Sequence, residues 1–157
     1  MPIADLLTTG RIVVLTEAGN RDQVLDAAAR LLADGSPNMT SVIGAALRER
    51  EALGSTAIGH GVAIPHARSK AFSAARGTFL RLDHPIDFGA RDHAPVDLVF
   101  AMSVPEHSSQ QHLEILSELA ERFSSESFRD ALRDARDVRT LYGILCGLPQ
   151  PTMAMLH

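Results

Sequence analysis

The stretch that decides how this chain folds is Gly54-Ser55-Thr56-Ala57-Ile58-Gly59-His60-Gly61-Val62-Ala63-Ile64-Pro65-His66. Its glycines interrupt any helix, and the apolar, partly β-branched residues that follow favour an extended backbone. Proline lacks a backbone donor and fixes φ, so it ends a central strand. The stretch therefore predicts a glycine-rich loop that enters a short strand over residues 62–64, with Pro65 ending that strand and His66 directly beyond it.

Helical periodicity precedes this stretch. Apolar residues recur at helical spacing over residues 20–35, which predicts one helix. The same spacing predicts a second helix that begins after Thr40 or Ser41 and ends at Gly54. A short apolar run over residues 12–15 is expected to form an edge strand or a loop packed on the core.

Longer strands and further helices are expected after the stretch. The predicted strands cover residues 76–82 and 96–104, and residues 84–89 are expected to form a turn-rich connection. Nearly unbroken apolar residues in the second strand indicate burial on both faces. Helices are predicted up to Phe123 and then over residues 126–134 and 138–145. Strands interleaved with helices favour an α/β (α+β) sandwich.

Composition bounds the class of protein. The chain has 157 residues, 45% of them hydrophobic and 22% charged, which suits one domain over residues 1–147 with a flexible tail over residues 148–157. A formal net charge of −4 offers no basic surplus for nucleic acid. The single Cys146 cannot form an internal disulfide, and no apolar run is long enough to span a bilayer. We expect a cytoplasmic protein that does not insert into membranes.

His66 is the histidine whose surroundings suggest chemistry. Ligands in α/β folds bind at strand ends and in the loops beyond them. Pro65 fixes the local backbone, and the glycines at positions 59 and 61 let another group come close. A histidine held in this way suits a nucleophile, a general base or a metal ligand.

Spacing weighs against a local zinc site. Neither the pair His60 and His66 nor the pair His107 and His112 has the three- or four-residue spacing of helical zinc ligands. A metal-dependent hydrolase assembled from distant histidines stays open as a hypothesis, but no metal is expected. The nucleophile elbow, the P-loop and the dinucleotide fingerprint are absent from the sequence.

His66 is instead predicted to accept a phosphoryl group. This chemistry needs a neutral imidazole nitrogen and donors that spread charge over the phosphoryl oxygens. Arg50 is predicted to supply a guanidinium, and His112 is predicted to donate to the phosphoryl group from the first turn of its helix. The hydroxyls of Ser55 and Thr56 are further candidates for binding it.

The segment from Arg50 to His66 resembles the active-site signature of the mannitol/fructose-type enzyme IIA family of the bacterial phosphoenolpyruvate:sugar phosphotransferase system. The resemblance covers roughly residues 5–146 and is strongest to the nitrogen-regulatory branch, whose members stand alone at about this length. Further segments support it: Pro85-Ile86-Asp87-Phe88, Pro95-Val96-Asp97-Leu98-Val99-Phe100-Ala101 and Gln111-His112-Leu113.

The resemblance implies a small mixed β-sheet flanked by helices on both sides. It also implies that His66 takes the phosphoryl group from a histidine phosphocarrier protein, that His112 supports this group, and that Arg50 lies beside it. No cofactor is implied. The partners implied are that carrier and regulated targets such as potassium-transport components or sensor kinases.

Two positions depart from the family pattern. His60 stands where relatives commonly have an uncharged amide, so it is either a third titratable group near the phosphate or an exposed loop residue. Ala67 follows His66 where glycine is usual. A left-handed alanine would cost about 1–2 kcal/mol, so we expect an ordinary negative φ there.

The leading hypothesis is a phosphohistidine relay and regulator, a phosphoryl-transfer component that controls partner proteins through its phosphorylation state. One alternative is a sugar-transport enzyme IIA that passes the phosphoryl group to a separate IIB domain. Another is a binding regulator without catalysis.

Overall fold

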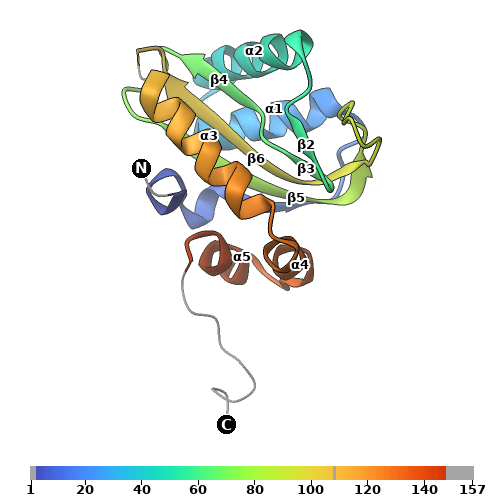
Figure 1. Ribbon diagram of the computed structural model, residues 1–157. Helices are drawn as coiled ribbons and strands as arrows, with labels where there is room; N and C mark the ends of the chain where they lie inside the picture. The colour runs from blue at the N-terminus through green and yellow to red at the C-terminus, as the bar shows by residue number, and fades with distance from the viewer. Residues whose placement is uncertain (1–2, 108, 148–157) are drawn as a thin grey trace.

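The computed structural model describes residues 3–107 and 109–147. Two short 3-10 helices begin the described chain, and a strand, two helices, five strands and three helices follow them (Figure 1). In order, the elements are η1 (Ile3–Leu6), η2 (Thr9–Arg11), β1 (Ile12–Leu15), α1 (Arg21–Leu32), α2 (Pro37–Leu53), β2 (Ala57–Gly59), β3 (Val62–Ala63), β4 (His66–Ser69), β5 (Arg76–Ile86), β6 (Val96–Pro105), α3 (Ser109–Phe123), α4 (Glu126–Asp134) and α5 (Val138–Leu145).

The strands form one mixed sheet. Its order is β1-β5-β6-β3-β2, and β4 pairs with β6 beyond β3. The long strands β5 and β6 are antiparallel, whereas β1 is parallel to β5, and both β3 and β4 are parallel to β6. The two short strands β3 and β4 therefore lie along the same side of β6, and the chain between them contains Pro65.

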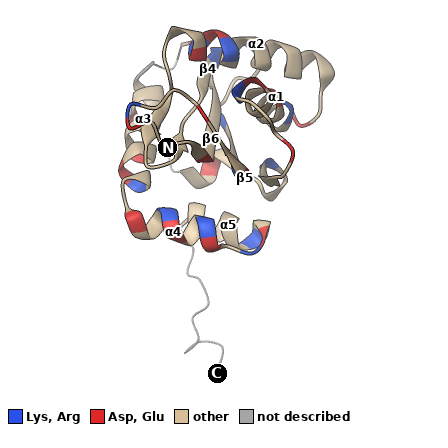
Figure 2. Cartoon of the chain, turned by 90° about the vertical axis from the view of Figure 1, so that its right-hand side faces the viewer, with Lys and Arg blue, Asp and Glu red and all other residues tan. Residues whose placement is uncertain are grey.

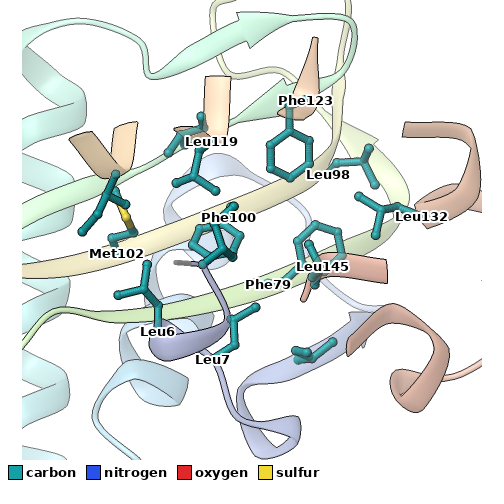
Figure 3. Packing of buried hydrophobic residues seen from close by; sticks show 14 of the residues in the cluster. Leu6, Leu7, Phe79, Leu98, Phe100, Met102, Leu119, Phe123, Leu132 and Leu145 are labelled. Carbon is teal, nitrogen blue, oxygen red and sulfur yellow. The ribbon is translucent and has the colours of Figure 1, made fainter. Parts of the chain in front are cut away.

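Helices cover both faces of this sheet. Side chains alternate along β5 and β6, so that Phe79 and Phe100 face one core while Leu80 and Val99 face the other. The first core packs against α3, α4 and α5 (Figure 3), and the second packs against α1 and α2. Figure 1 shows α3 crossing in front of the strands, with α1 behind them. The predicted α/β (α+β) sandwich with a small mixed sheet is confirmed.

Two predicted boundaries were wrong. Helix α2 begins at Pro37 rather than after Thr40 or Ser41, because the Ser36 side chain caps the backbone N–H of Met39 and proline is well tolerated in a first turn. Strand β5 continues to Ile86 through the segment expected as a turn. An irregularity in its pairing with β6 falls between Arg81 and Ile86, and it accommodates Pro85, which has no N–H to donate.

Strands β2 and β4 were not predicted. Strand β2 has only three residues and pairs only with the two-residue strand β3, so it has too little pattern to detect. Strand β4 forms because His66–Ser69 pairs in register with Met102–Pro105 of β6. Strand β3 ends at Ala63, one residue earlier than predicted, and the chain resumes extended pairing directly after Pro65.

Acidic and basic residues are interspersed along α4 (Figure 2). Its two arginines are engaged within the protein: Arg129 is buried and donates to the carbonyl of Phe123, and Arg133 pairs with Asp97. None of the helices in residues 3–107 and 109–147 is both long and apolar enough to cross a membrane. The expected tail over residues 148–157 lies outside the described residues.

Candidate functional site

His66 opens β4 and has one ring nitrogen already engaged. Its Nδ1 lies 2.8 Å from the carbonyl oxygen of Ile64. A carbonyl oxygen can only accept, so Nδ1 carries the proton and the lone pair of the neutral ring sits on Nε2. The backbone is fixed on both sides, because the N–H of Met102 donates to the carbonyl of Pro65 at 2.9 Å. The ring therefore presents a nucleophilic Nε2 in a defined direction.

His112, on helix α3, lies against His66. It is the fourth residue of α3 and is only 7% exposed. The two imidazole centroids are 5.0 Å apart, and the planes meet edge-on at 72°. The Nδ1 of His112 accepts a hydrogen bond from Nε of Arg68 at 3.4 Å. Its Nε2 is the one buried side-chain nitrogen or oxygen in the described part of the chain that has no hydrogen-bond partner.

Both histidines are held in the neutral form. Burial lowers the pKa of His112 to about 4, and the charges of His66, Arg68 and Arg50 act in the same direction. Burial also lowers the pKa of His66, with Arg50 and Arg68 adding to the effect, while the hydrogen bond to Ile64 and the Glu51 carboxylate oppose it. A neutral ring is the nucleophilic form, and a neutral His112 with Nδ1 accepting must carry its proton on Nε2.

Arg50 reaches the same pocket from the end of α2. Its Nη1 donates to the carbonyl of Gly54 at 2.8 Å, which holds the guanidinium beside the loop. One pocket is lined by both histidines, by the arginines that flank them and by four neighbours: Ala46, Glu49, Arg50, Leu53, His66, Ala67, Arg68 and His112. The structure thus brings the three predicted site residues His66, His112 and Arg50 to one pocket.

Ser55 and Thr56 lie in an adjoining pocket that shares Arg50 and His66. Both side chains are engaged within the protein. The Ser55 hydroxyl donates to the carbonyl of Phe88 at 2.5 Å. Thr56 donates from its backbone N–H and its hydroxyl to the Glu51 carboxylate, at 2.7 and 2.5 Å. In this geometry the two residues shape the loop next to His66.

His60 is placed elsewhere. It lies in a separate depression with Arg91 and Asp92, which does not include His66. Its backbone has φ 57°, the left-handed conformation that asparagine tolerates well, which is a physical reason for an amide at this position. Its N–H donates to Asp92 at 2.9 Å, and its carbonyl accepts from Arg133 at 2.7 Å. His60 is therefore a turn residue in this structure.

Sequence reasoning missed Arg68 and Glu51. Arg68 follows His66 by two positions in β4, so both side chains point to the same face of the strand. This alternation was not visible because β4 itself was not predicted. Glu51 is 3% exposed, and a buried carboxylate is identified only once the helix is packed. Ala67 is in an ordinary strand conformation, as expected, and is not among the residues with positive φ.

Metal-ligating side chains do not converge in the described part of the chain. Within residues 3–107 and 109–147, no group of three or more histidine, cysteine, aspartate or glutamate side chains is placed to hold a metal ion. The hypothesis of a metal-dependent hydrolase therefore has no candidate centre in this region.

The fold and the pocket together define a class of protein: an α/β domain in which a histidine of the mixed sheet faces a histidine of a covering helix, with two arginines lining the same pocket. The family model described as "Phosphoenolpyruvate-dependent sugar phosphotransferase system, EIIA 2" matches residues 5–146. The chain belongs to this family.

Relatives of known name identify the branch. The chain is 40% identical to a nitrogen regulatory protein of Pseudomonas aeruginosa over 144 residues, covering 91% of this chain and 94% of that protein. It is 36% identical to a nitrogen regulatory protein of Bradyrhizobium diazoefficiens, covering 98% of this chain and all of that protein. The predicted resemblance to nitrogen-regulatory enzyme IIA proteins is confirmed.

Solved structures share the fold of this chain. The crystal structure of the nitrogen regulatory protein IIA-Ntr from Neisseria meningitidis superposes with a TM-score of 0.85 at 38% identity, covering 91% of this chain and 98% of that one. The mannitol IIA protein of Escherichia coli shares the fold, with a TM-score of 0.73 at 20% identity and coverage of 88% and 98%.

Proposed function

We propose that this protein accepts a phosphoryl group on Nε2 of His66 from the phosphohistidine of a carrier protein, and that its phosphorylation state controls partner proteins. Membership of the phosphotransferase-system family supports a phosphoryl-transfer component with a regulatory role. The observation that carries the proposal is the unpartnered, buried Nε2–H of His112 next to a histidine whose own Nε2 is free to attack.

The proposed step balances without a cofactor. The lone pair of His66 Nε2 forms a bond to phosphorus, and the nitrogen–phosphorus bond of the carrier breaks, returning its electron pair to the carrier's imidazole. Positive charge that develops on the His66 ring is stabilised at Nδ1–H by the Ile64 carbonyl. Arg50 and the Nε2–H of His112 balance the charge on the phosphoryl oxygens.

The same site offers a switch. A phosphoryl group adds close to two negative charges and several acceptor oxygens. It would be attached between Arg50, Arg68 and His112, in a pocket rimmed by exposed Leu53. A partner that contacts this rim meets a positive pocket in one state and a filled, negative one in the other. The partners we propose are a histidine phosphocarrier and regulated targets such as potassium-transport components or sensor kinases.

The test is the intact mass of the protein after incubation with phosphoenolpyruvate, enzyme I and the phosphocarrier. Wild type should gain one acid-labile phosphoryl group, and His66→Ala should gain none. His112→Ala should still be labelled, but about 10²-fold more slowly, since it removes a donor to the transferring group. His84→Ala is the matched control, because His84 is exposed on β5. Labelling of His66→Ala would contradict the assignment of the acceptor.

A further inference from the structure

Arg68 lines the pocket and contacts the second histidine directly. Its Nε lies 3.4 Å from Nδ1 of His112 and donates to it. Its side chain points to the same face of β4 as His66, and the backbone of β4 is fixed by pairing Arg68 with Val104 of β6. The sheet thus holds Arg68 and His66 in a constant relation, while His112 is held by α3.

An arginine is a permanent donor with no acceptor atom. Because Arg68 donates to Nδ1 of His112, that nitrogen must be the bare acceptor of the ring. Burial keeps the ring neutral, so its only proton is on Nε2. The opposite tautomer would turn an N–H toward the guanidinium and leave Nε2 with a lone pair, which would repel a phosphoryl oxygen.

We infer that Arg68 is a positioning residue that sets the tautomer of His112, so that its unpartnered Nε2–H is available as a donor to the phosphoryl group on His66. This inference rests on the proposed function. It predicts that the charge of Arg68 is not sufficient by itself: what matters is a donor at the position of Nε. It also explains why a nitrogen that is buried in the protein remains without a partner in the described chain, since it is kept for an incoming acceptor.

The test measures the tautomer itself. Protein labelled with 15N at histidine gives long-range 1H–15N correlations that report which ring nitrogen carries the proton. Wild type should show His112 as the Nε2–H form. Arg68→Met keeps the side chain as far as the position of Nε but supplies no donor there, and it should give a mixture of both tautomers. Arg68→Lys, which supplies a donor and no acceptor, should restore the Nε2–H form.

Transfer kinetics form the second readout. Arg68→Met should slow phosphoryl acceptance at saturating phosphocarrier by up to about tenfold, the effect of one lost hydrogen bond. Arg68→Lys should recover most of this loss. Arg136→Met is the matched control, because Arg136 is an exposed arginine between α4 and α5 that lines neither histidine pocket.

Failure of this inference can be told from failure of the proposed function. The tautomer measurement needs no phosphoryl donor. If wild-type His112 carries its proton on Nδ1, or if Arg68→Met and wild type show the same pure tautomer, the inference is wrong even when His66 is phosphorylated. If wild type shows the Nε2–H form and Arg68→Met does not, the inference stands, and a wild type that accepts no phosphoryl group would contradict the proposed function alone.

Discussion

The two facing histidines differ at the level of single atoms, and this difference supports the distinct roles that we propose for them. His66 is tied at Nδ1 to a backbone carbonyl and is free at Nε2, so it can attack. His112 is engaged at Nδ1 as an acceptor and is free at Nε2 as a donor. Nε2 of His66 therefore offers a lone pair, whereas Nε2 of His112 offers a proton, because the Nδ1 atoms of the two rings have different hydrogen-bond partners.

Neutral burial of His112 predicts a dependence of stability on pH. Burial lowers its native pKa from 6.5 to about 4. Between these values the unfolded chain binds a proton that the native ring does not, so the free energy of unfolding falls as pH falls from about 6.5 to about 4. The loss is on the order of 3 kcal/mol and is absent above this window.

The measurement is urea unfolding of wild type and His112→Gln from pH 7 to pH 4. Because other groups titrate in both proteins, the difference between their free energies of unfolding isolates His112. As the pH falls, the free energy of unfolding of wild type should decrease relative to that of His112→Gln. His84→Gln controls for the loss of a histidine as such, and parallel curves for wild type and His112→Gln would contradict a buried neutral ring.

At the scale of elements, the turn between β2 and β3 is constrained both by its backbone conformation and by a helix that packs on it. His60 and Gly61 both have left-handed φ, 57° and 79°. Arg133 of α4 binds both oxygens of Asp97 at 2.9 Å and also the carbonyl of His60. The turn is thus braced by a helix from the opposite end of the chain, and the loop leading to His66 starts from a fixed point.

Gly61→Ala should be strongly destabilising. A Cβ there would lie 2.6 Å from Nη2 of Arg133 and 2.8 Å from Oδ1 of Asp97, in addition to the cost of a left-handed alanine. Gly35→Ala is the matched control, because Gly35 has φ 83° but nothing within 4 Å of an added Cβ.

Thermal and urea unfolding would compare the two variants. The free energy of unfolding of Gly35→Ala should be about 1–2 kcal/mol below that of wild type, which is the cost of a left-handed alanine backbone alone. The free energy of unfolding of Gly61→Ala should be lower by at least about 1 kcal/mol more, because the ion pair between Arg133 and Asp97 must move. Equal losses would mean that the ion pair adjusts freely and does not brace the turn.

At the scale of the molecule, two exposed apolar residues border the two pockets that His66 lines. Leu53 at the end of α2 is 82% exposed, and Ile58 on β2 is 44% exposed. Leu53 lines the pocket of His112, and Ile58 lines the adjoining pocket. An apolar rim around a charged centre suits transient docking of a protein partner.

Leu53→Ser should therefore weaken docking of the phosphocarrier without affecting the chemistry. We expect KM for the carrier to rise by several-fold, corresponding to about 1 kcal/mol, with kcat unchanged. Val42→Ser is the control, since Val42 lies on the same helix, is 51% exposed and lines neither pocket. Steady-state transfer from phosphorylated carrier measures both constants. A fall in kcat instead of a rise in KM would place Leu53 in the transfer step and contradict a docking role.

The sequence predicted those features of the fold that depend on residues close together in the chain. Helical periodicity predicted α1, α4 and α5, because the apolar face of a helix repeats within a few residues. Glycines and Pro65 next to His66 marked it as a candidate because they act on the backbone of their direct neighbours. Ser36 could have marked the start of α2 through its position before Pro37, a local signal that the stronger apolar pattern from residue 40 onward obscured.

Only the tertiary structure decided the relations between distant residues. Strand β4 exists because β6 offers it a partner, and no pattern within its four residues signals this. The same pairing brings Arg68 to His112, which lies 44 positions away along the chain. The sequence by itself indicated the family, through the resemblance carried by the segment from Arg50 to His66, and it predicted the layered class of fold and the candidate His66 from local backbone chemistry and periodicity. The protonation form of each histidine and the displacement of His60 from the site depend on burial and on hydrogen bonds between distant segments, and only packing of the whole chain fixes these.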